Sequence, residues 1–197
     1  MGKMTMALRG IAAVVLMALA CAPESAGQEL FSMTTVDVSW TSNVHGGLLH
    51  QYWKPGRGVE INVATTLGAG FFESGIAGQR YEPLEDVWGF GALWLYGGWG
   101  ARLQGLYGVT LGGSARLGIF RMTFDNVDHE FSGVANESEM ARMFCTTLSI
   151  PIAGAVSFVV SASHLRVYTF QRMSLWFASA GLRYAFSTPE RIKNFLR

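Results

Sequence analysis

One segment of the chain combines residue types that could perform nucleophilic chemistry. Residues 128–130 are Asp-His-Glu, and Ser132 follows two positions later. A serine, a histidine and a carboxylate are the nucleophile, base and orienting group of acyl transfer. His45 and His50 could supply a further base. A consecutive Asp-His-Glu is also typical of a solvated turn, and no recognisable enzyme motif surrounds it, so the sequence predicts no catalytic residue.

The remaining reactive residue types predict neither a metal nor a cofactor. The histidines and cysteines show no metal-ligand spacing. Gly89-Phe90-Gly91 is not followed by the third glycine that a phosphate-binding loop needs. Cys21 and Cys145 are the only cysteines, and export would remove or lipidate Cys21. Cys145 is therefore expected to be an inert, packed thiol without a disulfide partner.

Composition restricts the class of protein. The 197 residues are 50% hydrophobic and 15% charged, with mean hydropathy +0.25, whereas soluble domains carry about 25% charged residues. The 13% aromatic content and low charge exclude a disordered chain. The chain has 15 Lys and Arg residues and 14 Asp and Glu residues, so it carries no large excess of positive charge. It is therefore not expected to bind nucleic acid.

Residues 1–27 have the pattern of a secretory signal peptide. Basic residues precede an apolar segment at 11–20, which is too short to span a bilayer as a helix. Small residues before Gln28 form a cleavage site, and lipoprotein processing at Cys21 is the alternative. The sequence therefore predicts an exported chain in which basic and acidic residues are equal in number.

The mature chain alternates apolar and polar residues. In segment 35–42, Val36, Val38 and Trp40 share one face, and Asp37 lies on the other among hydroxyl residues. Similar alternation occurs in segments 59–67, 103–111 and 174–186. This period of two is typical of strands with one apolar face. Strands of about ten residues with aromatic residues near their ends are typical of transmembrane barrels.

The predicted fold is all-β: a transmembrane, antiparallel, up-and-down barrel over residues 28–186. Eight strands are expected, at about 33–42, 58–70, 87–98, 102–112, 116–126, 140–152, 157–170 and 175–186. Tight turns are expected at 112–114 and 153–154, and longer outer loops at 43–57 and 127–139. Segment 71–86 should be a short inner turn, but its sixteen residues could hold another strand pair and make ten strands.

Two other architectures compete with the barrel. Residues 146–165 carry no formal charge and are long enough for a membrane-spanning helix, although Pro151 and Gly154 interrupt them. A soluble secreted sandwich or barrel would also show alternating strands.

The last expected strand carries a family resemblance. Ser179, Gly181, Tyr184 and Phe186 occupy the four defined positions of a pattern that resembles the assembly signal of bacterial outer-membrane β-barrels. The resemblance implies a small outer-membrane barrel in a Gram-negative-type envelope, surrounded by lipid bilayer and inserted by the barrel assembly machinery. It does not select a function within that family.

Residues 187–197 continue beyond that signal. Thr188 could cap a short helix and Pro189 suits its first position, while Ile192 and Phe195 would share one face. Such an amphipathic tail could lie on the inner leaflet or dock on a periplasmic partner. A frayed tail is the alternative, because so short a helix is marginal alone.

The polar strand faces carry ionic residues that predict a charged lumen. They are Asp37, Glu60, Arg102, Arg116, Arg166 and Arg183, with His164 beside them. An eight-strand barrel is just wide enough for side chains to fill, and its charges must pair or stay hydrated. Because the last strand closes on the first, Arg183 is expected to pair with Asp37 or Glu60. Either a paired plug or a gated ion path would satisfy this pattern.

The sequence therefore favours a non-enzymatic outer-membrane barrel, structural or interaction-mediating, with a side-chain-filled lumen. A small pore for ions or solutes is one alternative. A lipid A-modifying enzyme is the other, because small barrel enzymes of that type use a serine–histidine pair with a carboxylate.

Overall fold

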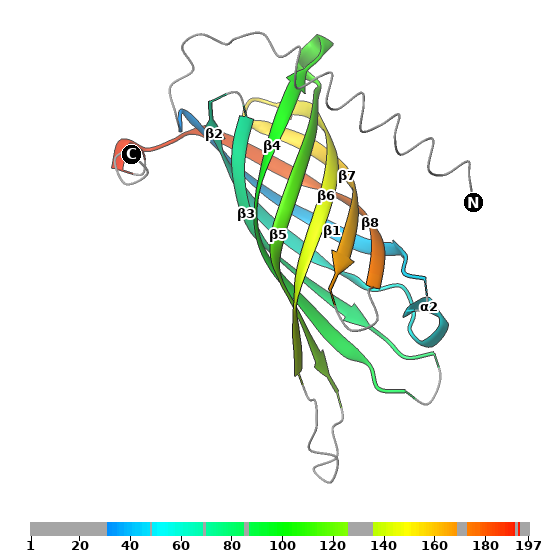
Figure 1. Ribbon diagram of the computed structural model, residues 1–197. Coiled ribbons are helices and arrows are strands. Elements are labelled where there is room, and N and C mark those ends of the chain that lie inside the picture. Colours follow the sequence, from blue (N-terminus) through cyan, green and yellow to red (C-terminus); the bar gives the residue numbers. More distant parts are fainter. Residues whose placement is uncertain are drawn as a thin grey trace, which may run out of the picture.

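The computed structural model describes residues 31–47, 49–68, 70–84, 87–125, 136–168, 173–191 and 193. These residues form a closed barrel of eight antiparallel strands, in which β8 returns to pair with β1 (Figure 1). The strands are β1 Met33–His45, β2 Arg57–Leu67, β3 Gly70–Tyr81, β4 Phe90–Gln104, β5 Thr110–Phe124, β6 Asn136–Ala153, β7 Val156–Val167 and β8 Met173–Ser187. The predicted signal peptide and residues 128–132 lie outside the described residues.

The two ends of the barrel differ in their connections. At one end, called the inner end here, short turns join β2 to β3, β4 to β5 and β6 to β7. At the other, called the outer end, longer segments join β1 to β2, β3 to β4 and β5 to β6, and a segment of five residues joins β7 to β8. The β1–β2 segment contains helix α2 Leu49–Tyr52 (Figure 1). Short turns at one end and longer loops at the other are typical of outer-membrane barrels.

The prediction of a closed, all-antiparallel barrel of eight strands is confirmed. The prediction for segment 71–86 was wrong, because it contains most of β3, a single strand. The strand predicted at 102–112 was also wrong, since β4 ends and β5 begins within it. The turn predicted at 112–114 lies inside β5. Within the part of the chain that the structure describes, no helix is long and apolar enough to cross a membrane.

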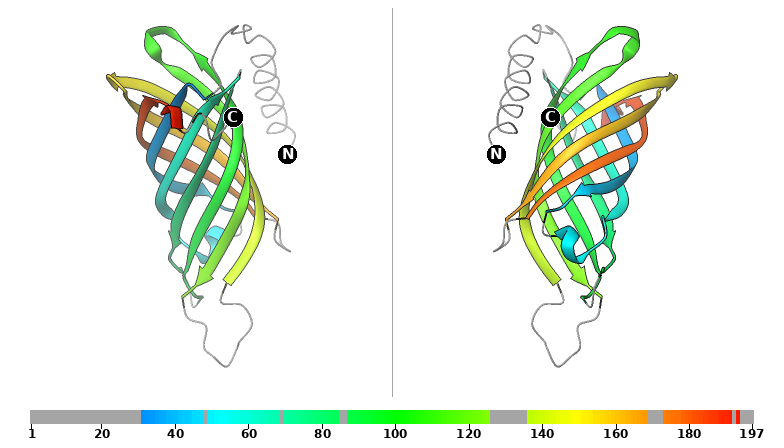
Figure 2. Two further views of the ribbon diagram at one scale, coloured as in Figure 1. Left: turned by 90° about the vertical axis from the view of Figure 1, so that its left-hand side faces the viewer. Right: turned by 90° about the vertical axis from the view of Figure 1, so that its right-hand side faces the viewer.

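The true turn between β4 and β5 is built around two glycines. The Gly105 N–H donates to the carbonyl of Val109 at 2.7 Å, and Leu106–Gly108 form one turn of 3-10 helix. Tyr107 and Gly108 have φ of 58° and 76°, the left-handed conformation that reverses the chain. Figure 2 shows this hairpin projecting past its neighbours at the inner end.

The outward face of the barrel is an apolar band. Trp40 is 58% exposed and Leu117 is 62% exposed, and both lie on the outward phase of their strands. Other exposed apolar residues of this face are Val38, Val59, Ile61, Val63, Phe72, Ile76, Leu93, Leu95, Trp99, Ile119, Phe144, Leu148, Ile150, Phe158, Leu182 and Tyr184. So much exposed apolar surface is expected only where an apolar medium covers it.

The outer half of the lumen is a hydrophobic core. Tyr81 and Phe90 stack with ring centroids 4.6 Å apart, and Leu49 of α2 joins the same cluster. Its other members are Ala92, Trp94, Tyr96, Phe120, Met122, Ala141, Met143, Leu165, Val167, Leu175 and Phe177. Polar and ionic side chains are therefore concentrated in the inner half.

Candidate functional site

The seam between the first and last strands is closed inside the lumen by an ion pair. Asp37 and Arg183 are directly opposite in the β1–β8 register. The Arg183 Nε donates to Oδ1 of Asp37 at 2.6 Å, and its Nη2 donates to Oδ2 at 2.7 Å. Both residues are buried. The structure therefore brings together Arg183 and one of the two carboxylates suggested for it.

A second ionic cluster surrounds Arg116 on β5. The Arg116 Nε and Nη2 donate to the two carboxylate oxygens of Glu73 at 2.7 and 3.0 Å, and Nη1 donates to Glu60 at 2.7 Å. The Tyr96 hydroxyl donates to the same Glu60 oxygen at 2.5 Å, and the Arg116 guanidinium lies 4.6 Å from the Tyr96 ring centroid. Asn62 donates to Glu73 at 3.0 Å. The cluster joins strands β2, β3, β4 and β5.

Arg102 on β4 is held without an ion pair among the described residues. Its guanidinium lies 4.2 Å from the ring centroid of Phe71, and its Nη2 donates to the hydroxyl of Thr35 at 3.3 Å. With Arg102 included, this part of the lumen holds equal numbers of guanidinium and carboxylate groups. A balanced interior is what a plug of paired charges requires.

The structure places Arg166 and His164 outside the lumen, which corrects their assignment to it. They lie on the outward phase of β7, where Arg166 faces Arg142 and His164 faces Phe144 across the β6–β7 ladder. The inward phase of β7 at this level instead holds Leu165, because the outer half of the lumen is apolar. An ionic side chain near the outer end therefore fits better on the outer surface.

Glu73 is the residue that sequence reasoning missed. It is 2% exposed and is the bidentate partner of Arg116. It lies in β3, which was predicted as a turn, so no interior position was assigned to it. Polarity gave no signal here: Phe71, Glu73 and Gly75 belong to the inward phase and Phe72 and Ser74 to the outward phase, so both faces mix apolar and polar residues.

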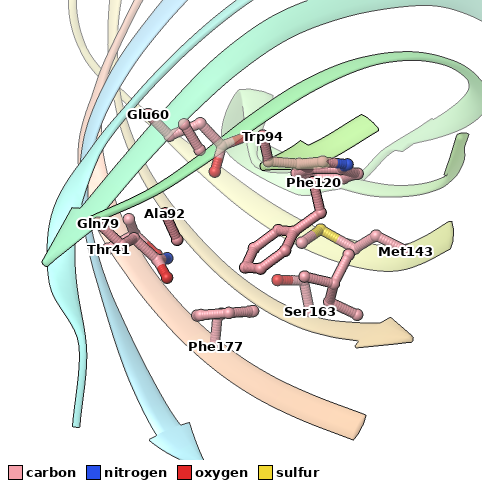
Figure 3. Close-up of a pocket in the computed structure, with 11 residues that line it drawn as sticks. Thr41, Glu60, Gln79, Ala92, Trp94, Phe120, Met143, Ser163 and Phe177 are labelled. Atoms are coloured by element: carbon pink, nitrogen blue, oxygen red, sulfur yellow. The ribbon is translucent and has the colours of Figure 1, made fainter. Parts of the chain in front are cut away.

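Three cavities among the described lumen residues are each of the size of a single water molecule. A cavity of about 10 Å³ separates the ionic and apolar halves; its lining includes Glu60, Gln79, Trp94 and Phe120 (Figure 3). Two further cavities, of about 20 and 10 Å³, lie beside the ionic clusters, and Asn62 lines both. A cavity needs roughly 10–15 Å³ to hold one water molecule. The buried Asn62 Oδ1 has no protein partner, so a water there would satisfy it.

His45 at the end of β1 and His50 in α2 contact each other rather than the lumen charges. The rings of His45 and His50 are 6.5 Å apart. His50 hydrogen-bonds with Oδ1 of the buried Asn43, which donates through Nδ2 to the Trp176 carbonyl at 2.8 Å. Burial and the neighbouring His45 lower the pKa of His50 below its ordinary value. These contacts anchor α2 to the outer end of the barrel.

The four residues of the assembly-signal pattern lie on β8. Ser179 and Gly181 belong to its inward phase, and Tyr184 and Phe186 to its outward phase, where their rings stack at 6.0 Å. A Cβ on Gly181 would lie 2.2 Å from the carbonyl oxygen of Val38 on β1. Glycine is therefore needed at this position for the seam itself to close.

Known proteins resemble this chain in structure rather than in sequence. No protein-family model matches the sequence, and no curated protein matches it. Among solved structures, Neisserial surface protein A aligns with a TM-score of 0.58 at 16% identity, covering 78% of this chain and 96% of that one. The fold is that of a small outer-membrane β-barrel. OprG, an outer membrane protein from Pseudomonas aeruginosa, aligns with a TM-score of 0.55 at 8% identity, covering 81% of this chain and 98% of that one. The likeness shows the shared barrel architecture and supports the outer membrane as its location.

Proposed function

We propose that this protein is a non-enzymatic outer-membrane β-barrel whose lumen is filled by side chains, and that its role is structural or interaction-mediating. The exposed apolar band supports residence in a lipid bilayer. The longer connections at the outer end supply the surface that could meet a partner, because loops on a rigid scaffold are where binding residues concentrate.

The filled lumen is the observation that carries this proposal. Paired guanidinium and carboxylate groups occupy the inner half, and packed aromatic and aliphatic side chains occupy the outer half. An ion crossing the outer half would lose its hydration without gaining a partner, which is costly. The arrangement therefore favours a plug over a gated path.

Conductance in planar lipid bilayers tests the plug. The folded protein should show no stable channel, whereas a variant with Trp94→Gly and Phe120→Gly, which removes two of the three large rings lining the cavity between the halves, should conduct. Stable channels from the unmodified protein would overturn the plug and favour the small pore. Fractionation with heat-modifiable gel mobility tests the membrane location separately.

The enzymatic alternative has its own readout. The segment that motivated it, residues 128–132, lies outside the described residues. Expression of the protein should leave the mass of lipid A unchanged, and a mass shift abolished by Ser132→Ala would refute the non-enzymatic role.

The route to the membrane forms part of the proposal. A signal peptide over residues 1–27 would direct export, and β8 would be recognised by the barrel assembly machinery through Tyr184 and Phe186. Tyr184 is exposed and Phe186 is half-buried, and their stacked rings on the outward phase at the inner end of β8 support that role. Thr188 ties the following tail to the barrel, because its N–H donates to the Ser32 carbonyl at 3.1 Å.

A further inference from the structure

Two arginines lie side by side on the outward surface of the barrel. Arg142 on β6 and Arg166 on β7 are directly opposite in the β6–β7 register, and both are half-buried on the outward phase. The Arg142 guanidinium lies 5.7 Å from the ring centroid of Tyr168, whose N–H donates to the Met140 carbonyl at 3.0 Å. The pair therefore lies on a surface fixed by backbone hydrogen bonds between the two strands.

This pair lies near the outer edge of the apolar band, with one exposed apolar residue, Met140, beyond it on β6. Along the outward phase of β6, Ile150, Leu148 and Phe144 precede Arg142 in the direction of the outer end. Along β7, Phe158 and then Val160 and Ala162 precede His164 and Arg166 in the same direction. At such a boundary, lipid headgroups replace acyl chains. Long arginine side chains at this edge can extend their guanidinium groups to the level of the headgroups.

The charges of the pair are uncompensated within the described part of the protein. Like charges directly opposite on a sheet destabilise it, and no described carboxylate forms an ion pair with Arg142 or Arg166. The contrast is Arg80, also outward-facing near the outer end, whose guanidinium donates to both carboxylate oxygens of Asp125. The Arg142–Arg166 pair lacks such a partner on the described part of the protein and would be stabilised by an external anion.

We propose that Arg142 and Arg166 bind the phosphate group of an anionic lipid in the outer leaflet. Guanidinium groups present paired N–H donors that match phosphate oxygens, and two of them on neighbouring strands can hold one phosphate between them. Phe144 and Phe158, on the same face nearer the inner end, supply apolar surface for the acyl chains of that lipid. This site rests on the proposed membrane location.

Binding of lipid A, a phosphorylated glycolipid, to the folded full-length protein in detergent micelles tests the site by native mass spectrometry. Changing Arg142 and Arg166 together to Gln should weaken binding by about fivefold per guanidinium. The matched control changes Arg57 and Arg121 to Gln; these are outward-facing arginines near the same end, so the net charge is equal. Its binding should change less than about twofold, since Arg121 faces Leu93 and Ser138, and Arg80, which faces Arg57, is already paired with Asp125.

Two comparisons distinguish a lipid site from a diffuse charge effect and from a soluble-anion site. Lipid A without its phosphate groups should bind equally to the unmodified protein and to the Arg142/Arg166 variant. Equal weakening in both double variants would show a diffuse charge effect and overturn the site. Unchanged binding in both double variants would also overturn the site. Inorganic phosphate that competes at the same concentration as lipid A would identify a soluble-anion site and overturn the lipid assignment. Because binding is measured in micelles, its failure is distinct from failure of membrane fractionation, which tests the proposed function.

Discussion

Replacing Arg116 by methionine should be among the most destabilising single changes in this barrel. Arg116 is 5% exposed and neutralises two carboxylates, Glu60 and Glu73, with three hydrogen bonds of 2.7 to 3.0 Å. Methionine keeps an unbranched apolar stem that can pack where the Arg116 stem lies, opposite Met143 in the β5–β6 register. The change therefore removes the charge and its donors while leaving the volume partly filled.

The expected magnitude follows from the burial of the partners. Glu73 is 2% exposed, and the adjacent cavities are of single-water size, so solvent cannot replace the lost guanidinium. Breaking a buried pair by removing one partner costs about 3–5 kcal/mol of unfolding free energy. Glu73→Gln should cost less, about 1–3 kcal/mol, because Glu60 still compensates Arg116 and the amide oxygen still accepts a hydrogen bond.

Urea unfolding in detergent micelles or lipid vesicles, followed by tryptophan fluorescence, measures these differences. Arg121→Met is the matched control, since Arg121 is an exposed arginine on the outward phase of the same strand; it should change stability by less than about 0.5 kcal/mol. Combining Arg116→Met with Glu60→Gln and Glu73→Gln should recover part of the loss. A loss below about 1 kcal/mol for Arg116→Met would refute the picture of a dry, charge-balanced interior.

The seam and the outer end can be tested in three further ways. In a double-mutant cycle, Arg183→Ala and Asp37→Ala should each destabilise the barrel, and the double variant should cost less than their sum; strict additivity would mean that the pair contributes nothing. Gly181→Ala should lower the heat-modifiable folded fraction because its Cβ meets the backbone of β1, whereas Ala185→Ser should be tolerated; equal folded yields would contradict the close approach. Burial and a nearby imidazole lower the pKa of His50 below 6.5, so the neutral form of His50 favours folding above that pH, and this contribution is lost as the pH falls through the lowered pKa. His50→Gln should therefore flatten the pH dependence of the unfolding free energy in that range. An unchanged pH profile would contradict this role of His50.

The strands could be predicted where the two faces of the sheet differ in polarity. Segment 35–42 places Val38 and Trp40 against lipid and Asp37 in the lumen, so period-two alternation located β1 correctly. In β3 the contrast is lost, because Tyr81 and Ala77 face an apolar lumen. Polarity then no longer separates inside from outside, and the strand was missed.

The change in lumen polarity along the barrel also explains which residues of the site could be predicted. Asp37 and Arg183 lie in the inner half, where polar side chains do face the lumen, and the closing seam brings them together. Arg166 lies near the outer end, where the lumen is apolar, so an inward assignment failed. Ionic side chains face the lumen in the inner half of the barrel and the outer surface near its outer end. A rule that assigns ionic residues to the lumen along the whole strand therefore fails.

The seam pair also has a consequence for the order in which the barrel forms. Asp37 and Arg183 are separated by 146 positions in the chain, whereas the other strand pairs join neighbours in sequence. Contacts between distant residues carry the largest loop-closure entropy, so they form late. Until that step, the sheet is an open ribbon with two free edges, and both ions remain hydrated. Ring closure and dehydration of the inner lumen therefore become one cooperative event, and a chain that ends before β8 can accomplish neither.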